Sequence, residues 1–195
     1  LSGEKQLSYN NLLDLDAAVT MANETSTIKY ICIIVKHNIP CGASIESNHK
    51  KSYLNALAGD PISAFGGVVA FNKKITESTA KLLVKNFYEV VAAPEFEKNA
   101  LAILKSKKNL RVLKVNKFTK EIEQRSIFAG TLIQDVDNKK STIKKIFGVN
   151  KLSNEKIDFF TNILKFIKSN AIAVFDNTSL ISQSGGQTSR IDALE

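Results

Sequence analysis

Residues 30–42 read YICIIVKHNIPCG, an apolar run that ends abruptly in a charged and polar segment. Residues 30–35 are rich in β-branched side chains, which is typical of a buried strand. The pair Lys36-His37 follows at the carboxyl end of that strand, the edge where open α/β sheets bind ligands. The second of the two histidines, His49, lies in a polar segment that is predicted to be helical. His37 is therefore the first candidate for a proton-transfer residue.

The surrounding sequence alternates predicted helices and strands. Alternation of this kind favours an α/β fold in which strands joined by a helix lie parallel. The first lobe is expected to comprise residues 1–117. Its predicted elements are a helix over 11–22, a strand over 30–35, a turn at 40–42, a helix that stops near Gly59, a strand over 67–72, a helix after Thr76, a strand over 89–93, a helix from Phe96 and a strand over 110–115.

The remaining sequence predicts a connecting region and the opening of a second lobe. Residues 118–150 are expected to hold one strand and a connector rich in Lys, Asp and Asn, and residues 151–195 an incomplete second lobe. The predicted elements are a strand over 127–133, a helix capped by Ser153 with Ile157, Phe160, Leu164 and Ile167 facing inward, and strands over 171–175 and 180–183 that turn at Asp176-Asn177.

Composition narrows the class of protein. The chain has 195 residues, of which 44% are hydrophobic and 24% are charged, as in ordinary globular proteins. No apolar stretch approaches the roughly 20 residues of a membrane-spanning helix, and no signal peptide begins the sequence. The two cysteines, Cys32 and Cys41, lack metal-type spacing and provide no disulfide framework. We expect a cytoplasmic protein without a membrane partner.

The net charge of +8 raises the question of nucleic-acid binding. The lysines are spread along the chain, at the ends of predicted helices and in loops, and no aromatic residues are interleaved with them. They are interpreted as solvated surface charge, so no nucleic-acid partner is expected.

Six short segments, taken in order, resemble one known family. It is the transformylase part of the bifunctional purine-biosynthesis protein, which joins an inosine monophosphate (IMP) cyclohydrolase to an aminoimidazole carboxamide ribonucleotide (AICAR) formyltransferase. The segments are LSYNN at 7–11, KHNIPCGAS at 36–44, DPISAFGGVVAFN at 60–72, EVVAAP at 89–94, SNA at 169–171 and GQTSR at 186–190.

The resemblance implies a fold and an organisation. The fold would be a three-layer α-β-α sandwich that resembles the cytidine deaminase fold, with one full lobe and the start of a second. The chain would lack the cyclohydrolase domain and the closing stretch of the transformylase after Arg190, so the piece by itself is expected to be inactive. Family members are homodimers whose transformylase sites form between subunits.

The resemblance also implies the chemistry. The 5-amino group of AICAR would attack the formyl group of 10-formyltetrahydrofolate, which requires a base, an oxyanion stabiliser and close positioning. His37 would accept the proton of the amine, and Lys36 would place positive charge near the oxyanion. Asn170 would orient His37 and the substrate amide, and we expect its side chain within about 3 Å of Lys36-His37, directly or through one water.

Four further residues match binding positions of the family. Asn10 matches a nucleotide contact, Gly66 a glycine where the backbone approaches the ligand, Glu89 an acidic position in the nucleotide pocket, and Arg190 an arginine on the folate side. Gly66 could instead permit a tight turn, and Glu89 could be a solvating charge at a strand edge. No residue is predicted to ligate a metal, and an alkali cation is left open.

Two other readings stay open on the sequence. A zinc deaminase would explain Pro40-Cys41 as half of a Pro-Cys-x-x-Cys ligand pair, but position 44 is Ser44 and no His-x-Glu motif occurs, so we expect no bound zinc. A non-catalytic nucleotide-binding module would keep the fold without needing both Lys36 and His37.

Overall fold

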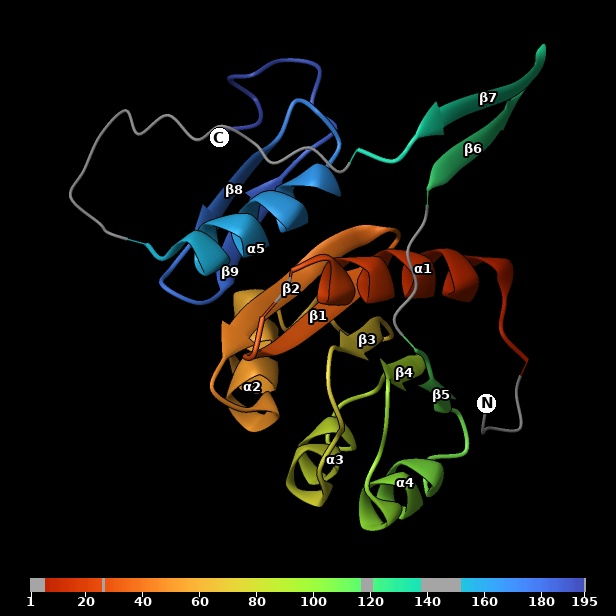
Figure 1. Cartoon of the computed structure of the whole chain (residues 1–195), viewed down its shortest axis with the longest axis vertical. Helices are drawn as coiled ribbons and strands as arrows, with labels where there is room; N and C mark the ends of the chain where they lie inside the picture. Colours follow the sequence, from red (N-terminus) through yellow and green to blue (C-terminus); the bar gives the residue numbers. More distant parts are fainter. Residues whose placement is uncertain (1–5, 26, 117–120, 138–151, 195) are drawn as a thin grey trace.

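The computed structural model describes residues 6–25, 27–116, 121–137 and 152–194. Figure 1 shows a central sheet with helices on both sides and a separate hairpin. In chain order the elements are α1 (Tyr9–Glu24), β1 (Tyr30–Lys36), β2 (Ile39–Glu46), α2 (His49–Gly59), β3 (Val68–Phe71), α3 (Glu77–Leu83), β4 (Val90–Ala93), α4 (Lys98–Lys105), β5 (Arg111–Lys114), β6 (Ile122–Ile127), β7 (Gly130–Asp135), α5 (Asn154–Lys165), β8 (Ile172–Phe175) and β9 (Leu180–Ser184).

The central sheet has five strands in the order β2-β1-β3-β4-β5. The helix-connected neighbours β3, β4 and β5 are parallel, as predicted, whereas β1 is antiparallel to both β2 and β3. Val35 pairs with Val68, so the end of β1 lies beside the start of β3. One edge of the sheet therefore collects the carboxyl end of β1 and the amino ends of β3, β4 and β5.

Alternate residues of each strand face two different cores. Ile31, Ile33 and Val35 of β1 pack with α1 and α5, whereas Cys32 and Ile34 pack with α2, α3 and α4. This alternation follows from the two-residue period of a strand, and both faces are apolar because helices cover both. The predicted three-layer α-β-α sandwich is confirmed, while the likeness to the cytidine deaminase fold stays a prediction.

Helix α1 begins at a cap that is encoded locally. The Ser8 hydroxyl accepts the backbone N–H of Asn11 at 3.1 Å, and the Asn11 side-chain oxygen accepts the backbone N–H of Ser8 at 3.1 Å. This reciprocal capping satisfies two N–H groups that a helix start leaves without partners. The predicted apolar face is confirmed at Val19 and Ala22, which are buried, whereas Leu12 in the first turn is half exposed.

Three predictions of local structure were wrong in detail. Residues 40–42 form part of β2, and the turn lies earlier, at His37-Asn38. The apolar run 127–133 is split by a turn between β6 and β7. Of the residues predicted to face inward from helix α5, Phe160 and Ile167 are buried, whereas Leu164 is exposed and Phe159 and Ile163 are buried in addition.

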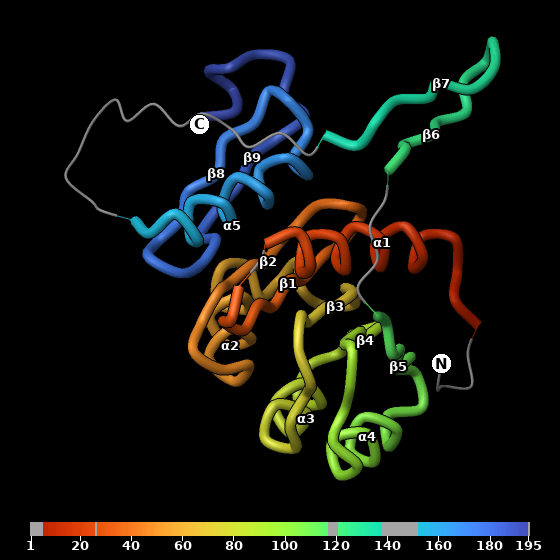
Figure 2. The backbone as a smooth tube through the Cα atoms, viewed as in Figure 1, coloured from red at the N-terminus to blue at the C-terminus, as the bar shows by residue number. Residues whose placement is uncertain are grey.

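The residues that follow β5 form two small units. The β6–β7 hairpin extends away from the body (Figure 2), and all twelve residues of its two strands are exposed. The predicted helix α5 and the two strands β8 and β9 are present, and Phe159, Ile163 and Leu180 join the core around α1. The proposed lobe boundary at residue 117 and most of the connector lie outside the described residues, so the division into lobes stays a prediction.

His49 is a core residue at the start of α2. Its ring packs edge-on against Tyr30 and Phe71, and Nε2 donates to the carbonyl of Lys73 at 3.2 Å. Burial lowers the pKa of His49 from 6.5 to about 4. A buried ring with this pKa is neutral near pH 7, which sets His49 apart from His37 as a structural residue.

The depressed pKa of His49 predicts a loss of stability in acid. Below about pH 6.5 the His49 imidazole binds a proton in the unfolded chain, whereas in the folded chain it does so only near pH 4. The free energy of unfolding should therefore fall across this window by up to about 3 kcal/mol from this residue alone. Urea unfolding at several pH values checks this, with His49→Phe as the comparison. If the wild type and the variant lose the same stability in acid, the burial of His49 is not the cause.

Candidate active site

Lys36 and His37 lie at the tip of the β1–β2 hairpin. His37 and Asn38 have φ angles of 55° and 64°, the left-handed conformation that a two-residue type I′ turn requires at both positions. Asp14 of α1 accepts both backbone N–H groups of the turn, His37 N at 3.3 Å and Asn38 N at 2.6 Å. Helix α1 thus holds the turn in place and leaves the His37 side chain exposed to ligands.

Lys36 reaches across the sheet edge to the loop before β3. Its Nζ donates to the carbonyl oxygen of Phe65 at 2.7 Å, next to Gly66. Gly66 has φ 74°, and its N–H donates to Phe87 O at 2.9 Å, so a glycine is favoured there for conformational reasons alone. The structure therefore brings together three of the predicted site residues, Lys36, His37 and Gly66.

Glu89 lies at the same edge, one residue before β4. Its Oε2 accepts Asn11 Nδ2 at 2.5 Å and lies 3.7 Å from an Arg111 guanidinium nitrogen at the start of β5. Asn10 is the exposed neighbour of Asn11 in the first turn of α1. The hydrogen bond between Asn11 and Glu89 therefore brings two predicted binding residues, Asn10 and Glu89, to the contact between α1 and the sheet.

Asn11 and Arg111 were missed from the sequence. Arg111 is the charged first residue of β5, whose next two residues, Val112 and Leu113, are apolar. It lies next to Glu89 because β4 and β5 are paired in parallel. A basic residue at the start of one predicted strand (Arg111) and an acidic residue at the start of the preceding one (Glu89) could have indicated an ion pair. Asn11 offered no such signal, because its contact with Glu89 spans 78 residues.

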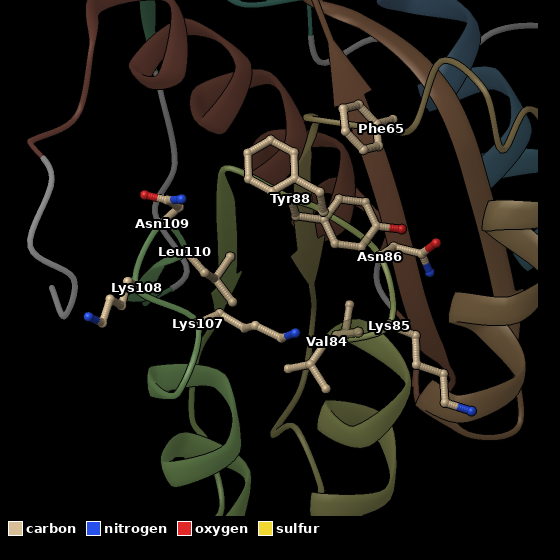
Figure 3. Close-up of a pocket in the computed structure, with 11 residues that line it drawn as sticks. Phe65, Val84, Lys85, Asn86, Tyr88, Lys107, Lys108, Asn109 and Leu110 are labelled. Carbon is tan, nitrogen blue, oxygen red and sulfur yellow. The ribbon is translucent and has the colours of Figure 1, made fainter.

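A pocket of about 390 Å³ opens beside Phe65 (Figure 3). It lies between the loops that lead into β4 and β5. Its apolar walls include Phe65, Val84 and Leu110, while lysines and carboxamides stand around it. The lining residues are Phe65, Leu83, Val84, Lys85, Asn86, Phe87, Tyr88, Lys107, Lys108, Asn109 and Leu110.

The lysines of this pocket have a structural role as well. Helices α3 and α4 both end at this edge, and Lys85, Lys107 and Lys108 follow their last turns closely. Cations stabilise the negative end of a helix dipole. An anionic ligand with an aromatic part would meet the same charges and the Phe65 ring, which is 62% exposed.

The sequence also matches a known protein family. A family model described as AICARFT/IMPCHase bienzyme matches residues 1–195. The chain belongs to this family. It is 40% identical over 198 residues to the bifunctional purine biosynthesis protein PurH of Persephonella marina and 42% identical over 195 residues to that of Fusobacterium nucleatum. The match to PurH of Clostridium botulinum is 41% over 191 residues.

This chain spans about two fifths of the length of the relatives that it matches. The three alignments cover 96–98% of the chain and 38% of each relative. Within the described residues, no helix is long and apolar enough to cross a membrane.

Two predicted site residues of the AICARFT/IMPCHase chain lie in the C-terminal unit. Asn170 precedes β8, and its side-chain Nδ2 donates to the carbonyls of Gln187 at 3.0 Å and Thr188 at 3.3 Å. Arg190 is exposed in the turn that follows. Neither makes a recorded contact with Lys36 or His37 among the described residues, so the predicted approach of Asn170 stays a prediction.

The direction of β9 is compatible with that approach. Ser179 pairs antiparallel with Ser44 of β2, and their hydroxyls hydrogen-bond at 2.9 Å. From this point β9 runs in the direction opposite to β2, toward the end of the sheet that holds the His37 turn. Ile172 pairs with Ser184 at the far end of β9, so the start of β8, next to Asn170, lies at this same end.

Cys41, the possible zinc ligand of the deaminase hypothesis, lies in a partly buried position. Cys41 is partly buried in β2, its thiol contacts Ile34 O at 3.5 Å, and burial raises its pKa to about 12. Zinc binds the thiolate, and burial disfavours that charged form of Cys41. Among the described residues, no three His, Cys, Asp or Glu side chains are grouped so that they could hold a metal ion.

Proposed function

We propose that this chain supplies the nucleotide-binding and proton-transfer part of an AICAR transformylase. The reaction is formyl transfer from 10-formyltetrahydrofolate to the 5-amino group of AICAR, within a bifunctional enzyme of IMP biosynthesis. The observation that carries the proposal is the gathering of Lys36, His37, Gly66 and Glu89 at one sheet edge in a chain that belongs to the AICARFT/IMPCHase family.

The proposed steps assign one role to each side chain. The amine nitrogen of AICAR attacks the formyl carbon and gives a proton to the His37 imidazole, the side chain most often used for this task. The ammonium of Lys36 stabilises the negative charge that develops on the formyl oxygen. The bond from the formyl carbon to N10 of the folate then breaks, and N10 takes up a proton. Asn170 is proposed to orient His37 and the carboxamide of AICAR.

The contact of Lys36 with Phe65 supports this assignment. A lysine held at 2.7 Å by a carbonyl has lost part of its side-chain freedom before a ligand arrives. Its second and third N–H groups can still turn toward an oxyanion, since an ammonium has three donors.

The remaining binding residues divide between the two substrates. Asn10, Gly66 and Glu89 are proposed to bind the nucleotide, and Arg190 the folate. The pocket beside Phe65 has the aromatic wall and the positive charge that suit the p-aminobenzoyl-glutamate part of a folate. We further propose that the complete enzyme is a cytoplasmic homodimer, and that any cation it uses is an alkali ion.

A formyl-transfer assay on the full-length enzyme tests the function. We expect formyl-AICAR to form only when both AICAR and 10-formyltetrahydrofolate are present, and release of tetrahydrofolate in equal amount. Binding of AICAR without any transfer would favour the non-catalytic nucleotide-binding module. Release of ammonia from a nucleoside with no need for folate would favour a deaminase. Either result would refute the proposed transformylase.

A further inference from the structure

A second set of contacts lies behind Glu89 and joins three distant parts of the chain. The Arg111 guanidinium donates to the backbone carbonyl of Gln6 at 3.0 Å, just before α1. Its other terminal nitrogen lies 3.7 Å from Glu89 Oε2, the same oxygen that accepts the amide of Asn11. Arg111 thus connects the start of β5 with the acid before β4 and with the segment that leads into α1.

The burial of Arg111 is unusual for an arginine. Only 10% of its side chain is exposed, and its Nε is a buried donor without a hydrogen-bond partner within the part of the chain that is described. Burying a guanidinium is costly unless it is paired and hydrogen-bonded. A separation of 3.7 Å from Glu89 is longer than a hydrogen bond, so the pairing is incomplete in this state.

The Glu89 carboxylate, unlike the Arg111 guanidinium, is partly exposed to solvent. Its side chain is 38% exposed, and the recorded contacts with Asn11 and Arg111 both use Oε2. The other oxygen, Oε1, is therefore the atom that can face a ligand at the sheet edge. Carboxylates bind ribose hydroxyls in dinucleotide sites, so this is a chemistry that an exposed carboxylate oxygen can supply.

We infer that Arg111 is a positioning residue for nucleotide binding: it holds the Glu89 carboxylate from behind through Oε2, so that Oε1 is aimed at donor groups of the nucleotide. The inference rests on the proposed function, because it takes Glu89 as a nucleotide contact. Asn11 shares the task, since its amide is fixed at one end by Ser8 and at the other by Glu89. The incomplete contact between Arg111 and Glu89 shortens when the nucleotide binds.

The test uses the full-length enzyme and measures kcat and both KM values, together with the Kd of AICAR by calorimetry. Arg111→Gln should raise the KM and Kd for AICAR by roughly tenfold, the scale of a lost charged hydrogen bond, and leave kcat and the KM of the folate within about twofold. Arg111→Lys should restore part of the loss, because it keeps the charge. Arg125→Gln is the matched control, since Arg125 is exposed on the β6–β7 hairpin, and should change nothing.

A double-mutant cycle separates positioning from a general effect on the fold. Glu89→Gln combined with Arg111→Gln should be no worse than Glu89→Gln alone, because Arg111 acts through Glu89. Additive losses, or equal changes in the KM of both substrates, would overturn the inference. If Arg111→Gln does not fold, Arg111→Lys takes its place in the cycle, and a rise in the KM for AICAR that adds to the rise caused by Glu89→Gln refutes the inference. Failure of the wild type to bind AICAR would instead refute the proposed function.

Discussion

His37→Ala in the full-length enzyme should lower turnover by roughly a hundredfold or more, the usual scale for loss of a general base. Lys36→Ala should have an effect of similar size, because positive charge near a developing oxyanion acts mainly in the transition state. In both variants the Kd of AICAR should change much less than kcat. Single-turnover measurements with saturating folate, beside calorimetric binding of AICAR, distinguish these effects.

The control variants for His37 are chosen to suit the left-handed conformation of the His37-Asn38 turn. Alanine is strained at the φ of 55° that residue 37 adopts, whereas asparagine tolerates this region. His37→Asn should therefore lose as much turnover as His37→Ala while keeping the turn intact. Asn38→Gly preserves the turn and both active side chains, so it should remain near wild-type activity. Normal turnover in both the His37 and the Lys36 variants would leave a binding module as the better explanation.

Gly42→Ala should destabilise the protein by about 3 kcal/mol, at the upper end of the cost of overpacking. A Cβ at Gly42 would lie 2.2 Å from the backbone oxygen of Ala56 in α2. The helix cannot yield by rotating a side chain, because the obstacle is its own backbone. Chemical unfolding followed by circular dichroism measures the loss.

The neighbour of Gly42 supplies the comparison for this prediction. Cys41→Ala changes the adjacent residue of β2 but removes atoms from a half-buried site, and should cost only about 1 kcal/mol. If Gly42→Ala unfolds at the same denaturant concentration as the wild type, the close approach of α2 to β2 is not required for the fold.

Gly42 also explains why the turn was misplaced from the sequence. Pro40 and Gly42 are strong turn signals, and a His-Asn pair lacks the glycine that type I′ turns commonly contain. Proline is accepted in β2 because this strand is at the edge of the central sheet, and Gly42 is needed for contact with α2. Both requirements arise from tertiary packing, which local sequence signals do not contain.

The elements with strong periodicity were predictable, and the contacts between them were not. The apolar strands β1, β3 and β4 and the capped helix α3 follow from side-chain patterns in short windows. The position at a strand end indicated Lys36 and His37, and the resemblance to a family supplied Glu89 as a further candidate residue. Asn11 became visible only when α1 packed against the sheet, and Arg111 only when the strand order placed β5 beside β4.

The orientation of α3 and α4 has a consequence for how an anion is held. Many phosphate sites use the backbone N–H groups at a helix start, which point at the anion and donate hydrogen bonds to it. Here α3 and α4 present their carboxyl ends to the sheet edge, whereas α1 begins there, so much of the attraction for an anionic ligand comes from exposed lysine side chains such as Lys85, Lys107 and Lys108. Attraction between exposed charges weakens as the Debye length shortens. Substrate capture at this edge is accordingly a property of the surrounding ionic strength as much as of the fold.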